Sequence, residues 1–238
     1  MTPAARVRAI LGDLRRAGSA ARREALTWYA PSAETSYGVS TPDMRRIARA
    51  HGRELATAPA EEVLAVARGL IDRGVRDGRH AAYEIVARHR PAMAALDRRT
   101  VEALGAGFDC WPSVDHFGTI IGGPAWRTGR IGDGDVARWA RSKDRWWRRA
   151  ALVATVGLNI RSRGGSADPV RTFAVCDRLA ADRDDMVVKA LSWALRELAK
   201  QEPAAVTGWL DEHDGELHAR VVREVTRKLT TGRKSGAR

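Results

Sequence analysis

A recurring segment limits what this chain can fold into. Four stretches share one pattern, in which a polar or charged start is followed by a basic residue, small apolar residues and then aliphatic residues: Asp77–His89, Asp144–Leu158, Asp184–Leu198 and Leu217–Leu229. The second and third begin 40 residues apart, at positions 144 and 184. Periods of about 35 to 45 residues made of helix pairs are typical of HEAT-like solenoids. We therefore expect an all-α protein, an α-α superhelix of HEAT-like helix pairs with a basic concave groove.

Apolar residues elsewhere in the chain also follow the helical period. In residues 60–74, apolar side chains recur at steps of about three and four, and no segment shows sustained strand alternation. Helix starts are predicted where a capping side chain precedes proline, at Thr2–Pro3, Thr41–Pro42 and Asp168–Pro169. Helix ends are predicted at Gly52, Gly74, Gly105 and the glycine pairs that begin at Gly122 and Gly164. The result is roughly a dozen helices of about 10 to 18 residues.

The repeated pattern continues almost to the C-terminus. We therefore expect one HEAT-like domain over residues 1–229. The last residues, TTGRKSGAR, are small, polar and basic, so residues 230–238 are expected to form a disordered basic tail.

The charge of the chain favours a polyanionic partner. It has 41 Lys and Arg residues against 29 Asp and Glu residues, a formal net charge of +12 and a pI near 10.8. A balance of this kind is typical of proteins that bind nucleic acid. The basic residues are spread along the whole chain, so a merely well-solvated basic surface is the alternative interpretation.

Several classes of site are not expected. The chain has two cysteines, Cys110 and Cys176, without a CxxC pair, and its six histidines show no metal-ligand spacing. Neither a disulfide framework nor a metal site is therefore predicted. No apolar run approaches the roughly 20 residues that span a bilayer, so no membrane partner is expected. These features fit a cytoplasmic protein, associated with the nucleoid if the partner is DNA.

A tryptophan and a carboxylate stand one helical turn apart in FDCWPSVDHFG, residues 108–118. Trp111 and Asp115 are four residues apart, so they would share a helix face. A carboxylate beside a large ring is either part of the packing or part of a site. His116 is assigned no role, because adjacent residues point to different helix faces.

Cationic residues accompany a second tryptophan. In the segment from Asp184, Lys189, Trp193, Arg196 and Lys200 fall at i, i+4, i+7 and i+11. Six apolar positions take the core face of the same helix: Val187, Ala190, Leu191, Ala194, Leu195 and Leu198. The tryptophan therefore lies on a cationic face.

The segment from Asp144 offers further arginines, among them Arg148 and Arg149. Equivalent helices of a solenoid line one concave surface, so we expect Trp111, Asp115, Arg149 and Trp193 to converge on one groove.

With these features the chain resembles the AlkD-type DNA glycosylases, a family of HEAT-like repeat proteins of alkylation repair. The likeness runs from about Tyr29 to Leu229. The motifs that carry it are YGVSTPDMRRIAR (37–49), WPSVD (111–115), WWRRAA (146–151) and KALSWALRELAKQEP (189–203).

The resemblance implies roles for particular residues. Trp111, Asp115 and Trp193 match the family's catalytic residues without substitution. Arg149 matches an arginine that contacts the DNA backbone, and Tyr29 matches a tyrosine that lines the site. Further DNA contacts are expected from Arg148, Lys189 and Arg196. A basic residue that some members carry two turns after the arginine would fall near Gly157, which is a departure from the family pattern.

The implied activity is hydrolysis of the N-glycosidic bond of a cationic purine alkylated at N3 or N7, in duplex DNA, to leave an abasic site. The resemblance implies no cofactor and a monomeric enzyme. No lysine stands at the proposed centre to form a Schiff base, so strand cleavage is not expected. A non-catalytic HEAT-like scaffold that binds nucleic acid or protein, and an RNA-binding solenoid, are the alternatives.

Overall fold

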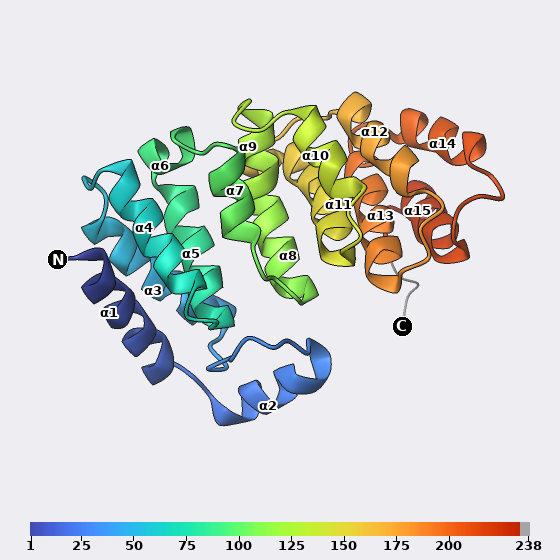
Figure 1. Cartoon of the computed structure of the whole chain (residues 1–238). Helices are drawn as coiled ribbons and strands as arrows, with labels where there is room; N and C mark the ends of the chain where they lie inside the picture. Colours follow the sequence, from blue (N-terminus) through green and yellow to red (C-terminus); the bar gives the residue numbers. More distant parts are fainter. Residues whose placement is uncertain (234–238) are drawn as a thin grey trace. The chain divides into compact units, whose positions relative to one another are not determined.

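The computed structural model describes residues 1–233 and is helical in almost all its regular structure (Figure 1). Over this range it contains fifteen α-helices, a π-helical turn at Gly118–Gly122 and a 3-10 turn at Arg161–Arg163. A single isolated β-bridge joins Thr35 to Val75. The predicted all-α fold of HEAT-like helix pairs is confirmed. None of the described helices combines the length and the apolar character that a membrane span requires.

Tertiary contacts divide the chain into two units, Met1–Ile121 and Gly122–Arg238. The helices of the first unit are α1 (Pro3–Arg16), α2 (Ala20–Tyr29), α3 (Thr41–Glu54), α4 (Ala60–Ile71), α5 (Arg76–Arg88), α6 (Arg90–Ala94), α7 (Arg98–Gly105) and α8 (Trp111–Phe117). Those of the second are α9 (Gly123–Arg127), α10 (Asp133–Ala140), α11 (Arg145–Asn159), α12 (Pro169–Leu179), α13 (Asp185–Leu198), α14 (Pro203–Glu212) and α15 (Ala219–Thr231). The single domain over residues 1–229 and its concave groove stay predictions.

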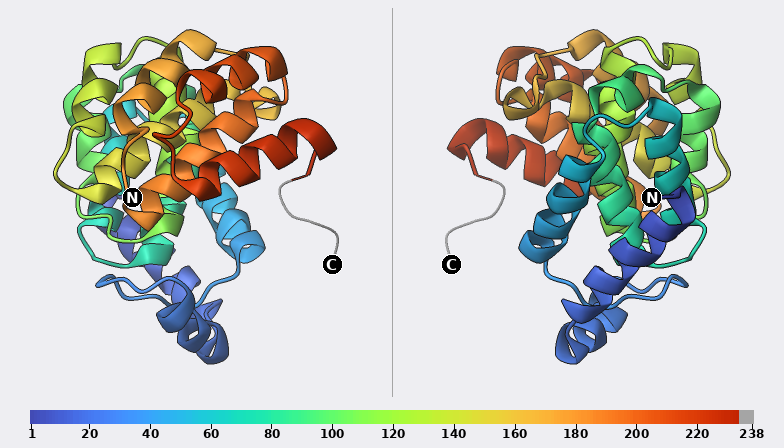
Figure 2. Two further views of the ribbon diagram at one scale, coloured as in Figure 1. Left: turned by 90° about the vertical axis from the view of Figure 1, so that its right-hand side faces the viewer. Right: turned by 90° about the vertical axis from the view of Figure 1, so that its left-hand side faces the viewer.

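The four repeated segments correspond to α5, α11, α13 and α15. In the first unit α5 packs against α3, α4 and α8, and in the second α13 packs between α11 and α15 (Figures 1 and 2). All six apolar positions predicted for the core of α13 are buried, with at most 1% of their surface exposed. Three of the four repeated segments, α5, α11 and α13, are therefore helices with extensively buried faces, whereas α15 buries only Val221 and Val225.

Helix starts follow the predicted capping residues with one correction. The side chains of Thr2 and Asp168 cap α1 and α12. At α3 the cap is Ser40, whose side chain accepts from the backbone N–H of Asp43, while Thr41 is already helical. A serine directly before Thr-Pro takes the capping position because only the residue outside the helix has the required extended backbone.

The predicted ends at glycine are confirmed at Gly105 and wrong at two other places. Helix α3 continues through Gly52 to Glu54, since an interior glycine costs a helix only about 1 kcal/mol. The pair Gly122–Gly123 lies inside a continuous helical run instead of ending one. A Cβ at Gly123 would lie 2.6 Å from the carbonyl oxygen of Ala154 and 2.7 Å from Cα of Gly157, so this glycine serves the close packing of α9 on α11.

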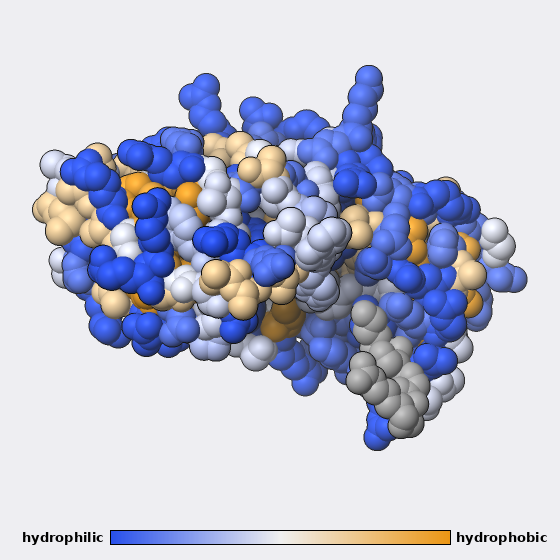
Figure 3. Space-filling view, turned by 90° about the horizontal axis from the view of Figure 1, so that it is seen from below, coloured by the Kyte–Doolittle hydropathy of each residue, from blue (hydrophilic) through white to orange (hydrophobic). Residues whose placement is uncertain are grey.

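The helices are shorter than the predicted length of about 10 to 18 residues, since their lengths range from 5 to 15 residues. The last helix, α15, continues to Thr231, two residues into the predicted tail, and ends at Gly232 in the left-handed conformation. Residues 234–238 of that predicted tail lie outside the described residues. Hydrophilic side chains dominate the surface in the view of Figure 3.

Candidate active site

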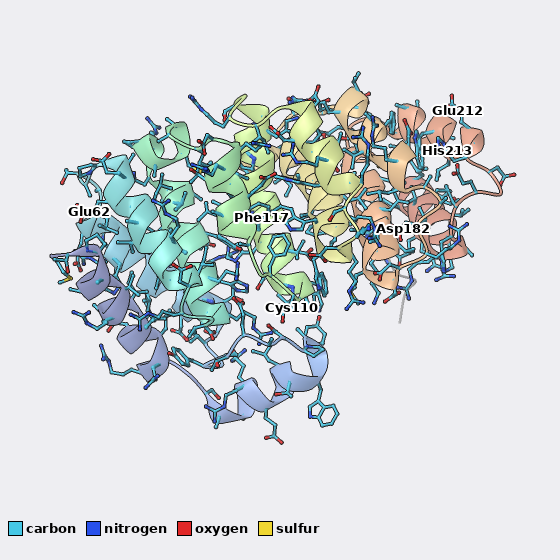
Figure 4. All side chains as sticks on the ribbon, viewed as in Figure 1. Glu62, Cys110, Phe117, Asp182, Glu212 and His213 are labelled. Atoms are coloured by element: carbon cyan, nitrogen blue, oxygen red, sulfur yellow. The ribbon has the colours of Figure 1, made fainter. Side chains whose placement is uncertain are left out.

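Helix α8 carries the predicted Trp111–Asp115 pair. Its buried side chains are Ser113, Val114 and Phe117, so the opposite face, with Trp111 and Asp115, is partly exposed. Figure 4 shows Cys110 and Phe117 near the two ends of this helix. The predicted placement of the two site residues one turn apart on a helix is confirmed.

A π-helical turn, Gly118–Gly122, directly follows α8. The hydroxyl of Thr119 donates to the backbone carbonyl of Asp115 at 2.8 Å, which ties the end of α8 to this turn. Short π-helical segments are frequent at functional sites because they displace the helix register locally. The sequence reasoning missed this turn, since its last residue, Gly122, suggested a helix end.

Tyr29 lies against Trp111. The two rings meet edge to face, with centroids 5.2 Å apart and an interplanar angle of 85°. The indole Nε1 of Trp111 donates to the backbone carbonyl of Tyr29 at 3.5 Å. Tyr29 itself is 69% exposed. The structure therefore brings together three predicted site residues of the first unit: Tyr29, Trp111 and Asp115.

Asp109 fixes this arrangement from the loop before α8. Its carboxylate accepts one hydrogen bond from the Ser32 hydroxyl and one from the Ala33 backbone N–H, both at 2.5 Å. These bonds attach the segment after α2 to the loop that leads into α8. Asp109 was not predicted, because its partners are separated from it by more than 70 residues.

A buried carboxylate stands behind α8. Glu84 on α5 is bonded to three cationic or ionisable side chains, Arg45 at 2.9 Å, His116 at 3.0 Å and Arg88. Burial raises the pKa of Glu84, but hydrogen bonds from His116 and Arg88 outweigh it and hold the pKa well below its usual range. His116 thus binds α8 to α5, on a different face of α8 from Trp111 and Asp115.

Next to it, His80 of α5 contacts both Ser113 and His116. Its Nε2 lies 3.1 Å from the Ser113 hydroxyl, and its ring centroid lies 5.0 Å from that of His116. Burial, followed by the charges of His116 and Arg76, lowers the pKa of His80 well below its usual value. His80 is therefore neutral near pH 7, and it gives the Ser113 hydroxyl a partner inside the core.

In the second unit, Arg149 is buried at the start of α11. Its Nη1 donates to the backbone carbonyl of Met186 in the first turn of α13. Arg148 is half-buried: its Nε donates to Asp182 at 2.7 Å, and its Nη1 donates to the carbonyls of Ser142 and Lys143. Both arginines hold the loops around α11 and α13, a role that sequence reasoning did not assign.

The predicted cationic face of α13 is present. Trp193 is half-buried on this face, with Lys189 one turn before it and Arg196 one turn after it. Lys189 forms an exposed ion pair with Asp185 at 2.6 Å. Arg196 is largely buried and is bonded to the Ser192 hydroxyl at 3.1 Å, close to Glu224. Burial lowers the pKa of Arg196, while the charges of Glu224 and Glu197 oppose that effect.

The predicted site residues are thus distributed over both units. Trp111, Asp115 and Tyr29 belong to the first, and Arg148, Arg149, Lys189, Trp193 and Arg196 belong to the second. Within residues 1–233, no group of three or more His, Cys, Asp or Glu residues has the arrangement of a metal site.

Comparison with known proteins places the chain. A sequence model of the family described as "DNA alkylation repair enzyme" matches residues 10–229. Among solved structures, the predicted DNA alkylation repair enzyme from Enterococcus faecalis is similar, with a TM-score of 0.73 and 16% sequence identity over 90% of this chain and 97% of that chain. This likeness concerns the fold. No curated protein matches. Because the family match extends over nearly the whole sequence, the chain belongs to the DNA alkylation repair enzyme family.

Proposed function

We propose that this protein is a monofunctional DNA glycosylase, which hydrolyses the N-glycosidic bond of purines alkylated at N3 or N7 in duplex DNA and leaves an abasic site. The observation that carries the proposal is the Trp111–Asp115 pair on one face of α8, with the Tyr29 ring against Trp111, in a chain of the alkylation repair family.

One carboxylate is sufficient for this reaction. Enzymes that hydrolyse ordinary glycosides use two carboxyl groups, one of them to protonate the leaving group. An N3- or N7-alkylated purine already carries a positive charge, so it leaves without a general acid. What remains to be stabilised is the positive charge that develops on the sugar, and an ionised Asp115 would stabilise it and orient or deprotonate the attacking water.

The aromatic residues suit a cationic substrate. Trp111, and Trp193 on α13, would present electron-rich faces to the alkylated nucleotide. The edge-to-face contact of Tyr29 restrains the Trp111 ring, so the ring is held in place before substrate arrives. Exclusion of water by the Trp111 ring would strengthen the interaction of Asp115 with the sugar.

The residue content of the first unit supports a hydrolytic reaction without strand cleavage. The sequence contains no lysine before Lys143, so no lysine of the unit that carries Asp115 can form a Schiff base with the sugar.

The predicted contacts to the DNA backbone differ in how readily they could be made. Lys189 is the most available, since its side chain is 43% exposed and its ion pair with Asp185 lies at the surface, whereas the side chains of Arg148 and Arg196 are 20% and 12% exposed. We therefore assign phosphate contact first to Lys189. We propose that Arg148, Arg149 and Arg196 also hold α11 and α13 in place. The DNA backbone would lie against these two helices.

Release of free base tests the proposal. Duplex DNA that carries N7-methylguanine or N3-methyladenine is incubated with the wild type and with Asp115→Asn, and the base released in a single turnover is measured. We expect the variant to be slower by at least about tenfold, on the scale of losing one electrostatic catalytic group. Asp72→Asn is the matched control, because Asp72 is an exposed carboxylate of the same unit at the end of α4.

Two results would contradict the proposal. Equal rates for the wild type and Asp115→Asn would exclude the assigned role of Asp115. Absence of base release from both methylated duplexes and from one with a bulky N7 adduct, with DNA binding intact, would favour a non-catalytic scaffold.

A further inference from the structure

A cavity of about 440 Å³ lies where α11 and α13 end, in the second unit. One side is formed by the turn after α11, with Arg161, Ser162 and Arg163. The other side is formed by the end of α13 and the residues after it, Glu197, Lys200 and Gln201. None of these residues belongs to the site assigned above.

The cavity has a preformed frame. The side-chain amide of Gln201 donates to the backbone carbonyl of Asn159 at 2.8 Å, and its oxygen accepts from Arg161 Nε at 2.6 Å. Arg127 donates to the backbone carbonyl of Arg163 at 3.1 Å. A Cβ at Gly165 would lie 2.3 Å from the Leu158 carbonyl oxygen, so the turn folds back tightly onto α11. The cationic side chains are therefore presented by a fixed backbone.

The charge in the cavity is positive. Arg161, Arg163 and Lys200 face a single carboxylate, Glu197, and Lys200 engages that carboxylate at 2.6 Å. In the described part of the chain, the Arg161 side chain forms a hydrogen bond to Gln201, and that bond uses Nε. The terminal guanidinium nitrogens of Arg161 and the exposed Ser162 hydroxyl can therefore serve a ligand. A guanidinium fork with a hydroxyl beside it matches the oxygens of a phosphate.

The cavity continues the cationic face of α13. Lys189, Trp193 and Arg196 recur along that face at helical spacing, and Lys200, two residues after the end of α13, lies in the cavity. A strand of nucleic acid that follows this face would reach the cavity at the end of α13. Contacts of this kind fix the position of a duplex without reading its sequence.

We propose that this cavity is a binding site for a phosphodiester group of the DNA backbone, with Arg161 as its main ligand and Lys200 and Ser162 beside it. The inference deepens the proposed function, because it rests on DNA as the partner. The turn at residues 160–163 would then contribute to the affinity for DNA whether or not the DNA contains an alkylated base.

Salt-dependent binding of a lesion-free duplex tests the site. The affinity is measured by fluorescence anisotropy across a series of KCl concentrations for the wild type and for the double variant R161Q/K200Q. Each phosphate contact makes the slope of log K against log salt more negative by about 0.9. We expect the variant to reduce the magnitude of that negative slope by about 1, the value for one phosphate contact, and to lower the affinity near 0.1 M salt by about tenfold.

A matched control separates a local site from overall charge. R141Q/R178Q removes two exposed arginines of the same unit, Arg141 directly after α10 and Arg178 on α12, and changes the net charge by the same amount. We expect it to leave the slope within about 0.5 of the wild type. Ser162→Asp, which places a carboxylate in the cavity at an exposed position, is expected to weaken binding as R161Q/K200Q does.

Equal loss in R161Q/K200Q and R141Q/R178Q would overturn the proposal, since long-range charge would then be the whole effect. An unchanged slope in R161Q/K200Q would overturn it as well. Base release is not used in this assay, so a failure of the glycosylase proposal is seen separately, in the Asp115→Asn comparison.

Discussion

The carboxylate of Glu84 on α5 lies 3.0 Å from Nε2 of His116 on α8, directly behind the face that carries Trp111 and Asp115. Arg45 and Arg88 bind the same carboxylate from α3 and α5. A buried ion cluster of this kind adds little net stability compared with apolar packing, but loss of one partner leaves the others unpaired. The cluster therefore specifies how α8 is rotated against α5.

Glu84→Gln should destabilise the first unit. The side chain of Glu84 is 5% exposed, so the substitution leaves buried donors without a charged acceptor. Because Arg45 and Arg88 are partly exposed and can be solvated, we expect a loss of about 2 kcal/mol, below the range for a fully buried pair. For a chain of this size that corresponds to a fall in Tm of about 4 to 8 °C, measurable by circular dichroism. Glu24→Gln, an exposed change on α2, should leave Tm unaltered.

The effect of Glu84 should disappear in acid. Its pKa is depressed in the folded protein, so the stabilisation is fully present above the unfolded pKa of about 4.5 and is lost as pH falls towards the folded value. The difference in Tm between the wild type and Glu84→Gln should therefore be constant from pH 6 to 7 and should shrink below about pH 4. A difference that stays constant down to pH 3 would show that the Glu84 charge does not contribute.

Tyr29→Ala should slow base release through Trp111. The edge-to-face contact between the rings has a typical worth of about 0.5 to 1.5 kcal/mol, so a rate reduction of about 2- to 10-fold is expected if the contact holds Trp111 in its reactive position. Tyr29→Phe keeps the ring and should stay close to the wild type. Trp28→Ala is the neighbouring control, since Trp28 is 85% exposed and next in sequence. Equal effects of the alanine variants at positions 28 and 29 would argue against a specific role of the ring contact.

Gly123→Ala should destabilise the second unit. The added methyl would lie 2.6 Å from the Ala154 carbonyl oxygen, and backbone cannot move aside as a flexible side chain can. Overpacking at such a contact costs about 1 to 3 kcal/mol, which a urea titration would detect. Gly134→Ala on α10 is the control, because nothing lies within 4 Å of its added Cβ. That control should be neutral or stabilising by up to about 1 kcal/mol.

Much of the fold could be predicted from the sequence because helical periodicity is local. The core positions of α13 and the caps of α1 and α12 follow from residues within one or two turns of each other. The same local rule placed Trp111 and Asp115 on one face of a helix. The glycine pair at 122–123 was misread, since a glycine that ends a helix and one that lets two helices approach, as Gly123 does, look alike until the neighbour is known. Gly52 was misread because α3 continues through it, although nothing packs within 4 Å of its Cβ position.

What the sequence determined by itself is the set of helices, the apolar face of each and the residue types available for chemistry. Only the tertiary structure decided which side chains meet: Tyr29 with Trp111 across 82 residues, and Glu84 with His116 across 32. It also showed that Arg148 and Arg149, which resemble free surface cations in the sequence, hold neighbouring backbone. The physical reason is that secondary structure depends on short-range backbone geometry, whereas partners between helices depend on packing among residues that are distant along the chain.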